Sequence, residues 1–412
     1  PHPPAVHLMP TNMANGHHQP PADQPWTKVV PSTATHLPTA QRRQHFHVAP
    51  LDNSAVSAHI QEQRVSPATP PSSIPRRASD HAPAVSKASD GQQSERNPLK
   101  HQEKTPWSII FNEATVFAGH TEALTSCDYN AAQDRLMTTG LDCTIRIWNP
   151  ATGEQLKAFH GHKGFVTACG YSFDGQYIAS ASDDETVRVW DTEGRKLNTE
   201  RKHTGAVICA EWSKHDYRIV SGSADRTVRV WDGKRGTKIL TLRGHTGVVS
   251  GATFSGDDAH IMSVADDHTM RLWDVYTGKE LMLFQNPNQQ KSNSVCYAPG
   301  STTVLATACQ DATVKLWDYR TKSPVATLRG KHKGSVQHCL FGGFGAPDGA
   351  LLVSAGSDSK IVVWDVRTKT PLSTLKGHTA AVSRCTAGPG GLLYSSSADA
   401  SARKWSLTVQ AQ

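Results

Sequence analysis

The sequence is short of three things that many folds and sites require: paired cysteines, long apolar runs and, in its first quarter, aromatic residues. None of the eight cysteines forms a Cys-x-x-Cys pair or a zinc-ligand spacing, which indicates free thiols in a reducing compartment, the cytoplasm or the nucleus. No apolar run approaches the length of about 18 residues that crosses a bilayer. The start is too polar for a secretory signal, and because it begins with Pro1 we expect the natural N-terminus to be missing or processed.

Residues 1–106 lack the groups that build a core. They hold 17 of the 24 prolines but only 2 of the 31 glycines and 2 of the 28 aromatic residues. A segment so poor in large apolar side chains cannot offset the entropy of ordering its backbone. We therefore predict a disordered tail over residues 1–106, rich in Pro, His and Ser, and a folded domain over residues 107–412.

The charge distribution argues against a dedicated nucleic-acid-binding protein. The net charge is +7, of which +3 falls in residues 1–106 and +4 in the rest. Neither part carries the dense basic stripe of a dedicated nucleic-acid binder. Contact with nucleic acid through the tail stays open as an alternative.

What the sequence does contain is a repeat, and repeats are decisive for fold class. Seven tryptophans recur at spacings of 41 to 47 residues, with an Asp six positions before each, a Ser or Thr ten positions before each, and a His opening six of the seven repeats. The tryptophans are Trp148, Trp190, Trp231, Trp273, Trp317, Trp364 and Trp405. The aspartates are Asp142, Asp184, Asp225, Asp267, Asp311, Asp358 and Asp399. The hydroxyl residues are Thr138, Ser180, Ser221, Ser263, Thr307, Ser354 and Ser395. The histidines are His120, His162, His203, His245, His332 and His378.

This pattern, GH…(S/T)xxxD…WD, resembles the WD-repeat (WD40) family over about three quarters of the chain. The segments ASASDDETVRVWD and SGSADRTVRVWD are closest to the family pattern. The resemblance implies an all-β fold, a single seven-bladed β-propeller of four-stranded blades. The residues agree with this, because runs such as 186–190 favour strands, turn-forming clusters separate them, and residues 107–412 show no sustained helical period.

The repeat spacing predicts blade boundaries and the closure of the ring. We expect repeats at about 119–160, 161–201, 202–243, 244–285, 286–329, 330–376 and 377–412. Only seven residues follow Trp405, too few for a last outer strand, so residues 113–118 are expected to complete the last blade. Repeat 5 lacks its Gly-His and reads FQNPNQQKSNSV, and we expect its blade to be the least well fastened.

The recurring His, Ser/Thr and Asp superficially resemble a nucleophilic triad. The family resemblance implies instead a structural hydrogen-bonded network from His to Ser/Thr to Trp, with Asp tying its turn to the His. A catalytic centre occurs once per active site, whereas this set occurs six times complete and once partial. We therefore predict no enzymatic activity, no catalytic residue, no cofactor and no metal ion.

In the family, partners usually dock on the face and central mouth formed by the His-bearing loops and the Asp-bearing turns. Phe165 and Leu141 are the large apolar residues predicted there, and exposed apolar groups at a rim often mark a contact. Packing of Phe165 at the top of its own strand is the alternative. The predicted polar rim consists of Lys163, Asp183, Asp266, Gln310 and Lys333.

The leading hypothesis for function is a non-catalytic scaffold or adaptor subunit of an intracellular assembly. Its partners would be peptides or domains of other proteins, with the propeller monomeric inside a hetero-complex. The alternatives are an RNA-processing or chromatin subunit and a β subunit of a G protein; the latter family carries an N-terminal coiled coil, and residues 1–106 show no heptads. Short motifs predict phosphorylation at Ser79, after Arg76-Arg77, and at Ser66 and Thr69, each followed by proline.

Overall fold

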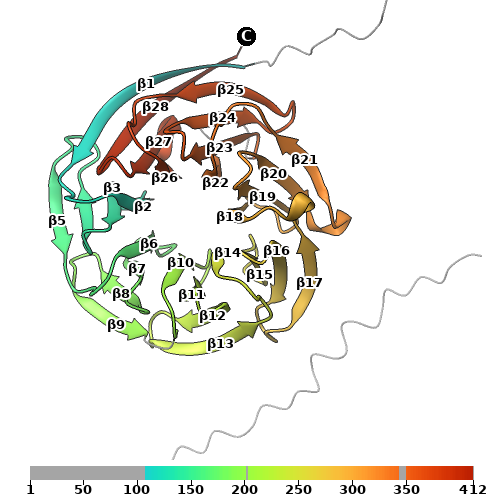
Figure 1. The fold of residues 1–412 in the computed structure, drawn as a ribbon. Helices are drawn as coiled ribbons and strands as arrows, with labels where there is room; N and C mark the ends of the chain where they lie inside the picture. The colour runs from blue at the N-terminus through green and yellow to red at the C-terminus, as the bar shows by residue number, and fades with distance from the viewer. Residues whose placement is uncertain (1–106, 201–202, 343–348, 412) are drawn as a thin grey trace, which may run out of the picture. The chain divides into compact units, whose positions relative to one another are not determined.

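The computed structural model describes residues 107–200, 203–342 and 349–411. The described strands form seven four-stranded antiparallel sheets, which are arranged as blades around a central opening (Figure 1). The prediction of an all-β, seven-bladed propeller is confirmed. The predicted tail and the sites at Ser66, Thr69 and Ser79 lie outside the described residues, and the boundary between tail and propeller stays a prediction.

The blades follow one another along the chain, and each runs from an inner to an outer strand. Blade 1 comprises β2 (Leu124–Asn130), β3 (Arg135–Gly140), β4 (Ile145–Trp148) and β5 (Gln155–Phe159). Blade 2 comprises β6 (Val166–Tyr171), β7 (Tyr177–Ser182), β8 (Val187–Asp191) and β9 (Lys196–Glu200). Blade 3 comprises β10 (Val207–Trp212), β11 (Arg218–Ser223), β12 (Thr227–Asp232) and β13 (Thr237–Arg243). Blade 4 comprises β14 (Val249–Phe254), β15 (His260–Ala265), β16 (Thr269–Asp274) and β17 (Glu280–Gln285).

The last three blades repeat this plan with one exception in strand order. Blade 5 comprises β18 (Ser292–Tyr297), β19 (Val304–Cys309), β20 (Val314–Asp318) and β21 (Pro324–Leu328). Blade 6 comprises β22 (Val336–Gly342), β23 (Leu351–Gly356), β24 (Ile361–Asp365) and β25 (Thr370–Leu375). Blade 7 comprises β26 (Val382–Ala387), β27 (Leu392–Ser397), β28 (Ser401–Ala411) and, as its outer strand, β1 (Trp107–Ala118).

Short 3₁₀ turns interrupt some of the loops between these strands. They are η2 (Pro287–Gln289), η3 (Tyr319–Thr321) and η4 (Pro389–Gly391). Among the residues that the structure describes, none belongs to a helix long and apolar enough to cross a membrane.

The middle strands of the blades are buried on both faces, which is why they are rich in apolar residues. The second strand of blade 2, β7, ends in five successive buried residues, whereas the outer strand β5 of blade 1 is exposed over much of its length. Neighbouring blades cover both faces of the middle strands, so these strands consist of small and β-branched residues instead of strictly alternating ones. An isolated blade would expose both faces, and stacking is what buries them.

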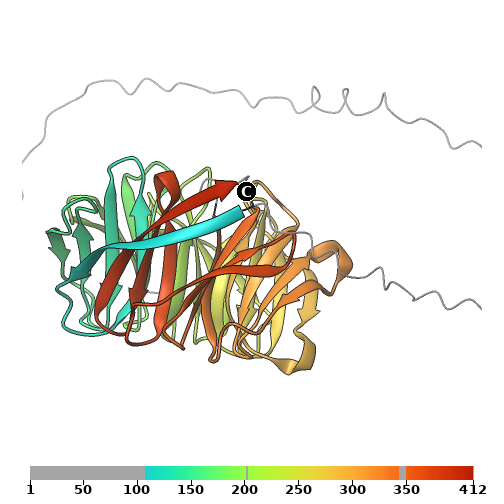
Figure 2. The ribbon, with the colours of Figure 1, turned by 90° about the horizontal axis from the view of Figure 1, so that it is seen from above.

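The ring closes through the two ends of the described chain. β1 pairs with β28 in antiparallel register, from Trp107 opposite Ala411 to Ala118 opposite Ser401, and Figure 2 shows the blue-green β1 beside the red strands of the last blade. Phe117 on β1 is buried, and its ring lies 6.0 Å from that of Trp148 in blade 1 and 6.4 Å from that of Tyr394 in blade 7. Closure removes the open sheet edge that would otherwise invite aggregation.

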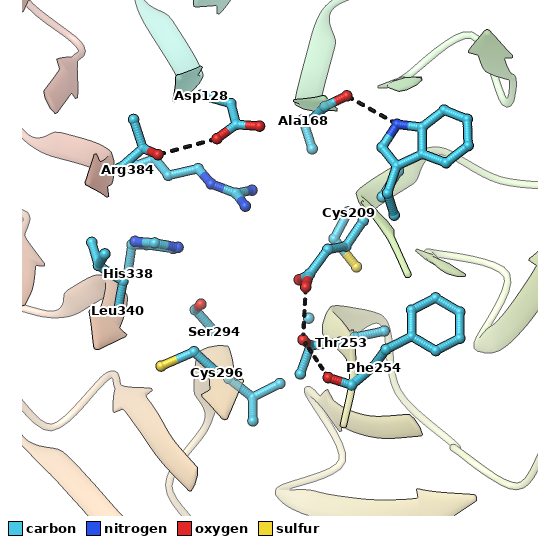
Figure 3. A pocket seen from close by; sticks show the side chains of 18 of the residues that line it. Asp128, Ala168, Cys209, Thr253, Phe254, Ser294, Cys296, His338, Leu340 and Arg384 are labelled. Carbon is cyan, nitrogen blue, oxygen red and sulfur yellow. Dashed lines mark hydrogen bonds between the residues drawn. The ribbon is translucent and has the colours of Figure 1, made fainter. Parts of the chain in front are cut away.

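Side chains at one end of the inner strands also tie neighbouring blades together. The second residue of five inner strands donates a hydrogen bond, of 2.5 to 2.7 Å, to the first carbonyl of the next inner strand: Thr125 to Val166, Thr167 to Val207, Ser250 to Ser292, Asn293 to Val336 and Ser383 to Leu124. The seven inner strands enclose a channel of about 820 Å³ (Figure 3).

The closing strand offers a matched pair of substitutions. Phe117→Ala should lower the free energy of unfolding by about 3–5 kcal/mol, because it leaves a cavity between blades 1 and 7. Val116→Ala, on the same strand but with a side chain that is 45% exposed, should cost about 0.5 kcal/mol. Denaturant unfolding followed by tryptophan fluorescence measures both losses, and equal losses would contradict the closure described above.

Candidate functional site

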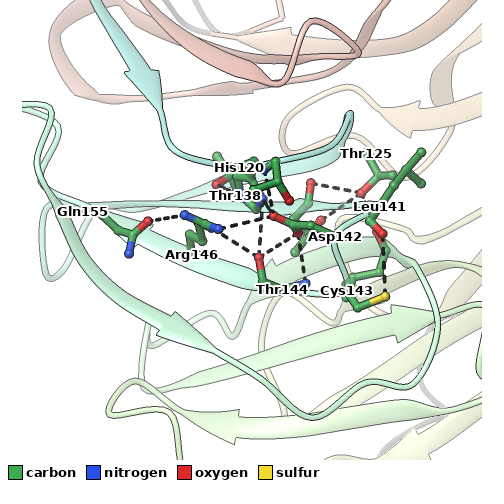
Figure 4. Close-up of polar contacts among 12 residues, drawn as sticks. His120, Thr125, Thr138, Leu141, Asp142, Cys143, Thr144, Arg146 and Gln155 are labelled. Carbon is green, nitrogen blue, oxygen red and sulfur yellow. Dashed lines mark hydrogen bonds and ion pairs between the residues drawn. The ribbon is translucent and has the colours of Figure 1, made fainter. Parts of the chain in front are cut away.

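A chain of hydrogen bonds runs through blade 1 from the turn aspartate to the tryptophan, and Figure 4 shows its aspartate, histidine and threonine. His120, in the loop before β2, donates from Nδ1 to Asp142 Oδ2 at 2.8 Å. The Thr138 hydroxyl on β3 lies 2.9 Å from His120 Nε2, and Trp148 on β4 donates from Nε1 to Thr138 Oγ1 at 2.7 Å. Four side chains from different segments are thereby held in one arrangement.

The same three bonds recur in five further blades, at 2.7 to 2.9 Å. The sets of His, Ser, Asp and Trp are His162, Ser180, Asp184 and Trp190; His203, Ser221, Asp225 and Trp231; His245, Ser263, Asp267 and Trp273; His332, Ser354, Asp358 and Trp364; and His378, Ser395, Asp399 and Trp405. The structure thus brings together, in six blades, the residues that the sequence pattern grouped.

In blades 1 to 4 and 7, the turn aspartate holds both its own turn and the histidine loop. In blade 2, Asp184 Oδ1 accepts from the backbone N–H and the hydroxyl of Thr186, while Oδ2 accepts from His162 Nδ1 and the backbone N–H of Lys163. Burial alone would raise the pKa of Asp184, but hydrogen bonds from His162 and Thr186 hold it well below its usual value of 3.8. The same holds for Asp225: burial raises its pKa, but hydrogen bonds from Thr227 and His203 outweigh burial and lower the pKa to about 2.

These bonds also hold a strained turn in place. The residue after each turn Asp is not glycine, yet its φ lies between +61° and +67°: Cys143, Glu185, Arg226, His268, Ala312, Ser359 and Ala400. Left-handed backbone is costly for such residues and persists where surrounding contacts determine it. The aspartate bonds supply those contacts.

In four blades the surroundings of the histidine favour its neutral form. A ring that donates from Nδ1 to a carboxylate and accepts at Nε2 from a hydroxyl carries a single proton. Burial lowers the pKa of His120, His162, His203 and His245 below 6.5, although their aspartate partners act in the opposite direction. The bonding pattern and the protonation state agree.

Blade 5, which lacks the His, uses a different set of contacts. Trp317 still donates to Thr307 Oγ1 at 3.0 Å. Lys315 is buried and donates from Nζ to Asn286 Oδ1 at 2.5 Å, with Asp311 3.6 Å away. Asn286 in turn donates to the backbone carbonyl of Gln290 at 2.7 Å, so this amide and a buried ammonium take over the fastening of the turn.

Sequence reasoning missed a further member of the network. The residue two positions before the repeat Trp is basic in six of the seven repeats, and this regularity was a usable signal. Arg146, Arg188 and Arg229 each place Nη2 3.1 to 3.4 Å from the turn aspartate of their own blade. The guanidinium adds a charge-assisted partner to a carboxylate that already accepts several hydrogen bonds.

The predicted contact residues lie on the face that carries the His-bearing loops and the Asp-bearing turns. Phe165 directly precedes the inner strand β6 and is 48% exposed. Its carbonyl accepts the backbone N–H of Asp183 at 2.9 Å, and in blade 1 the backbone N–H of Leu141 donates to Ala123 in the same way. The loop after the His and the turn before the Asp therefore meet beside the start of the inner strand.

The other predicted residues differ in how much surface they offer. Four are exposed: Lys163, Asp183, Gln310 and Lys333. Leu141 is half-buried, and Asp266 is half-buried and paired with Lys291 Nζ at 2.8 Å. Among the described residues of this face, Phe165 is the one exposed large hydrophobic side chain, since the others lie on outer strands or in loops at the opposite end of the blades.

Sequence reasoning also missed an aromatic group on the opposite face. Phe173, in the loop after β6, and Tyr276, in the loop after β16, are 49% and 74% exposed. The ring of Phe173 lies 5.0 Å from that of Tyr217, and Lys234 Nζ lies 3.4 Å above Tyr217. These residues occupy no fixed repeat position, so nothing in the periodicity pointed to them.

Comparison with known proteins agrees with this architecture. The family model described as WD domain, G-beta repeat (WD40) matches seven segments: residues 111–149, 153–191, 194–232, 236–274, 279–318, 322–365 and 369–406. The chain belongs to the WD40 family. The search of curated proteins finds no match.

WD40 propellers generally serve as protein-interaction scaffolds and are typically non-catalytic, and the geometry here fits that character. The seven hydroxyls that a triad would use as nucleophiles, on Thr138, Ser180, Ser221, Ser263, Thr307, Ser354 and Ser395, are fully buried. Each accepts the indole N–H of a tryptophan, so no substrate can reach them. Across the described residues, no three His, Cys, Asp or Glu side chains are grouped so that they could hold a metal ion.

Removing one hydroxyl of the WD40 network tests its structural role. Ser221→Ala leaves the Trp231 indole N–H without its acceptor and His203 Nε2 without its donor, and should lower the free energy of unfolding by about 1–3 kcal/mol. Ser323→Ala, an exposed control, should cost less than about 0.5 kcal/mol. Denaturant unfolding compares the two, and a loss for Ser221→Ala no larger than the control would show that the network does not stabilise the blade.

The lowered histidine pKa values predict the direction of pH dependence. The unfolded chain takes up protons on His120, His162, His203 and His245 near pH 6.5, whereas the folded chain resists them to lower pH. Lowering the pH from 7 to 5 should therefore reduce the free energy of unfolding, by up to about 1.4 kcal/mol per pH unit for each histidine. The turn aspartates, with lowered pKa values, add a loss in the same direction below pH 4. Denaturant unfolding at pH 7, 6 and 5 measures the slope, and a flat or rising stability would contradict it.

Proposed function

We propose that this protein is a non-catalytic scaffold or adaptor subunit that holds other proteins of an intracellular assembly. Its docking surface is the face that carries the His-bearing loops and Asp-bearing turns, centred on blades 1 and 2. The observation that carries this proposal is Phe165, which is 48% exposed directly before the inner strand β6. A large aromatic side chain left half in water at a concave rim is a typical anchor for a partner.

The chemistry around Phe165 supports the same interpretation. Lys163 and Asp183 are exposed and lie close by, the former two residues before Phe165 and the latter hydrogen-bonded to its carbonyl. Charges of both signs around an apolar anchor form the polar rim of a common protein–protein interface. The buried side chains of the network form hydrogen bonds to one another, so a partner would contact the exposed residues around Phe165 instead.

The alternatives named from the sequence depend on other parts of the chain. An RNA-processing or chromatin role rests on residues 1–106, which lie outside the described residues, and it remains a prediction. The monomeric state of the propeller within a hetero-complex also remains a prediction.

Affinity purification of the full chain, followed by quantitative mass spectrometry, tests the proposal. Phe165→Ala should reduce the recovery of at least one specific partner more than tenfold, since an anchoring aromatic contributes about 2 kcal/mol or more. Tyr276→Ala, an exposed aromatic on the opposite face, is the matched control and should leave that recovery unchanged.

Two outcomes would count against the proposal. Partners lost with Tyr276→Ala and kept with Phe165→Ala would place docking on the opposite face. A wild-type chain that captures no specific protein would remove the scaffold interpretation itself.

A further inference from the structure

The channel at the centre of the ring is lined in part by charged side chains, among them Asp128, Glu211 and Arg384. Its wall comes from all seven inner strands, and Figure 3 shows Asp128, His338 and Arg384 directed toward its centre. Charges in a partly enclosed site act more strongly than at an open surface, because less water screens them. Which of them are already occupied decides what the channel can bind.

The carboxylates that line the channel, Asp128 and Glu211, already accept hydrogen bonds from other groups of the protein. Asp128 accepts from the backbone N–H groups of Tyr129 and Tyr171, at 2.9 and 2.8 Å, and from the Thr386 hydroxyl at 3.1 Å. Glu211 accepts from Lys214 Nζ at 2.6 Å and from the Thr253 hydroxyl at 2.9 Å. Both negative charges therefore have donors within the fold.

Arg384 on β26 is different. Its backbone carbonyl accepts from Cys127 Sγ and Ser396 Oγ, which fixes the position of the residue. Its guanidinium has no hydrogen bond and no ion pair within 4 Å among the described residues, although it has five donors to satisfy. Burial lowers the pKa of Arg384, but the charges of Asp128 and Glu211 outweigh this and raise it, so the group stays cationic.

His338 on β22 adds a donor beside it. The backbone N–H of Cys385 points at His338 Nδ1 from 3.4 Å, and because an N–H can only donate, Nδ1 is the acceptor. Burial and the charge of Arg384 hold the pKa of His338 well below 6.5, so the ring is neutral and its single proton is on Nε2. His338 and Arg384 thus both present N–H donors to the channel.

We propose that Arg384 and His338 bind a carboxylate, namely an acidic side chain that a partner protein inserts into the channel. This inference rests on the proposed function and names the chemistry of the partner. A guanidinium pairs with a carboxylate through two parallel hydrogen bonds, and the His338 Nε2–H supplies a third donor. Because Asp128 and Glu211 already place two carboxylates on the wall, a singly charged group is favoured over a doubly charged phosphate.

The depth of the site matches insertion from the proposed docking face. Arg384 and His338 are each the third residue of their inner strand, and the inner strands begin at the face that carries the histidine loops. At about 3.3 Å per residue, the site lies roughly 7 Å below the mouth. An acidic residue at the tip of a partner loop docked around Phe165 reaches that depth.

Ligand-observed NMR titration of the full chain tests this with two short peptides, acetyl-Gly-Glu-Gly-amide and acetyl-Gly-Gln-Gly-amide. Wild type should bind the Glu peptide at least fivefold more tightly than the Gln peptide. Arg384→Gln should abolish that preference and His338→Leu should weaken it, while Arg384→Lys should retain part of it. Arg235→Gln is the matched control, because Arg235 is exposed on an outer hairpin, and it should behave as wild type.

The second measurement does not depend on a variant folding. Phenylglyoxal modifies accessible arginines, and mass spectrometry of the wild-type chain should show that the Glu peptide slows modification of Arg384 several-fold and leaves Arg235 unaffected.

Equal binding or equal protection by the two peptides, or no binding of the Glu peptide at any concentration, would overturn the proposal. Binding of inorganic phosphate in preference to the Glu peptide would overturn it in favour of a phosphate site. Because Phe165→Ala tests docking separately, a partner lost with that variant but unaffected by Arg384→Gln would remove the carboxylate site and leave the scaffold function standing.

Discussion

The fold depends on the need of a buried indole N–H for an acceptor. Each repeat tryptophan fills the space between two blades, and burying its ring brings a polar group into the interior, where an unpaired donor costs about 1–3 kcal/mol. A hydroxyl on the neighbouring strand meets that need, and its own proton goes to a histidine that is held by a turn aspartate. The need of the buried indole for an acceptor thus also determines, through the hydroxyl, the histidine and the aspartate, the conformation of the turns at the surface. Since neutral histidine completes this order of donors and acceptors, the same network makes the fold sensitive to acid.

Closure turns seven such units into one domain. Each blade contacts its two neighbours, so stability is a sum of blade and interface contributions, and blade 7 itself is completed by β1 and β28, which come from opposite ends of the described chain. Phe117 packs against both of these blades, which places the joint within the core. The hydrogen bonds between successive inner strands add a second tie around the channel. A rigid ring with a lined opening is well suited to present residues at fixed positions on one face.

The repeat made the architecture and the network accessible from sequence, because a fixed spacing of His, Ser/Thr, Asp and Trp reflects contacts within a single blade. The closing role of the segment around residues 113–118 followed from counting strands after Trp405. What could not be predicted lies outside the repeat pattern. Within blade 5, Asn286 takes the place of the histidine and accepts a hydrogen bond from Lys315, a pairing that the described residues of the other blades do not show. Arg384 and His338 look like ordinary strand residues until the ring places them beside one another, and the exposure of Phe173 and Tyr276 is decided by loops of varying length.

Residues at different depths in the propeller have different roles. The buried histidines, hydroxyls and aspartates of the network bond to one another. The Arg384 guanidinium in the channel has no hydrogen bond or ion pair among the described residues, and the proposed docking surface is formed by the exposed residues around Phe165. The repeat side chains hold each blade together from within, and hydrogen exchange of the tryptophan indole protons, followed by NMR, measures whether they do so in solution. The seven repeat indoles should keep their protons in deuterated water far longer than free tryptophan, with rates governed by unfolding of the ring. Exchange of these protons as rapid as in free tryptophan would show that the indoles are open to solvent and that the network does not exist in solution.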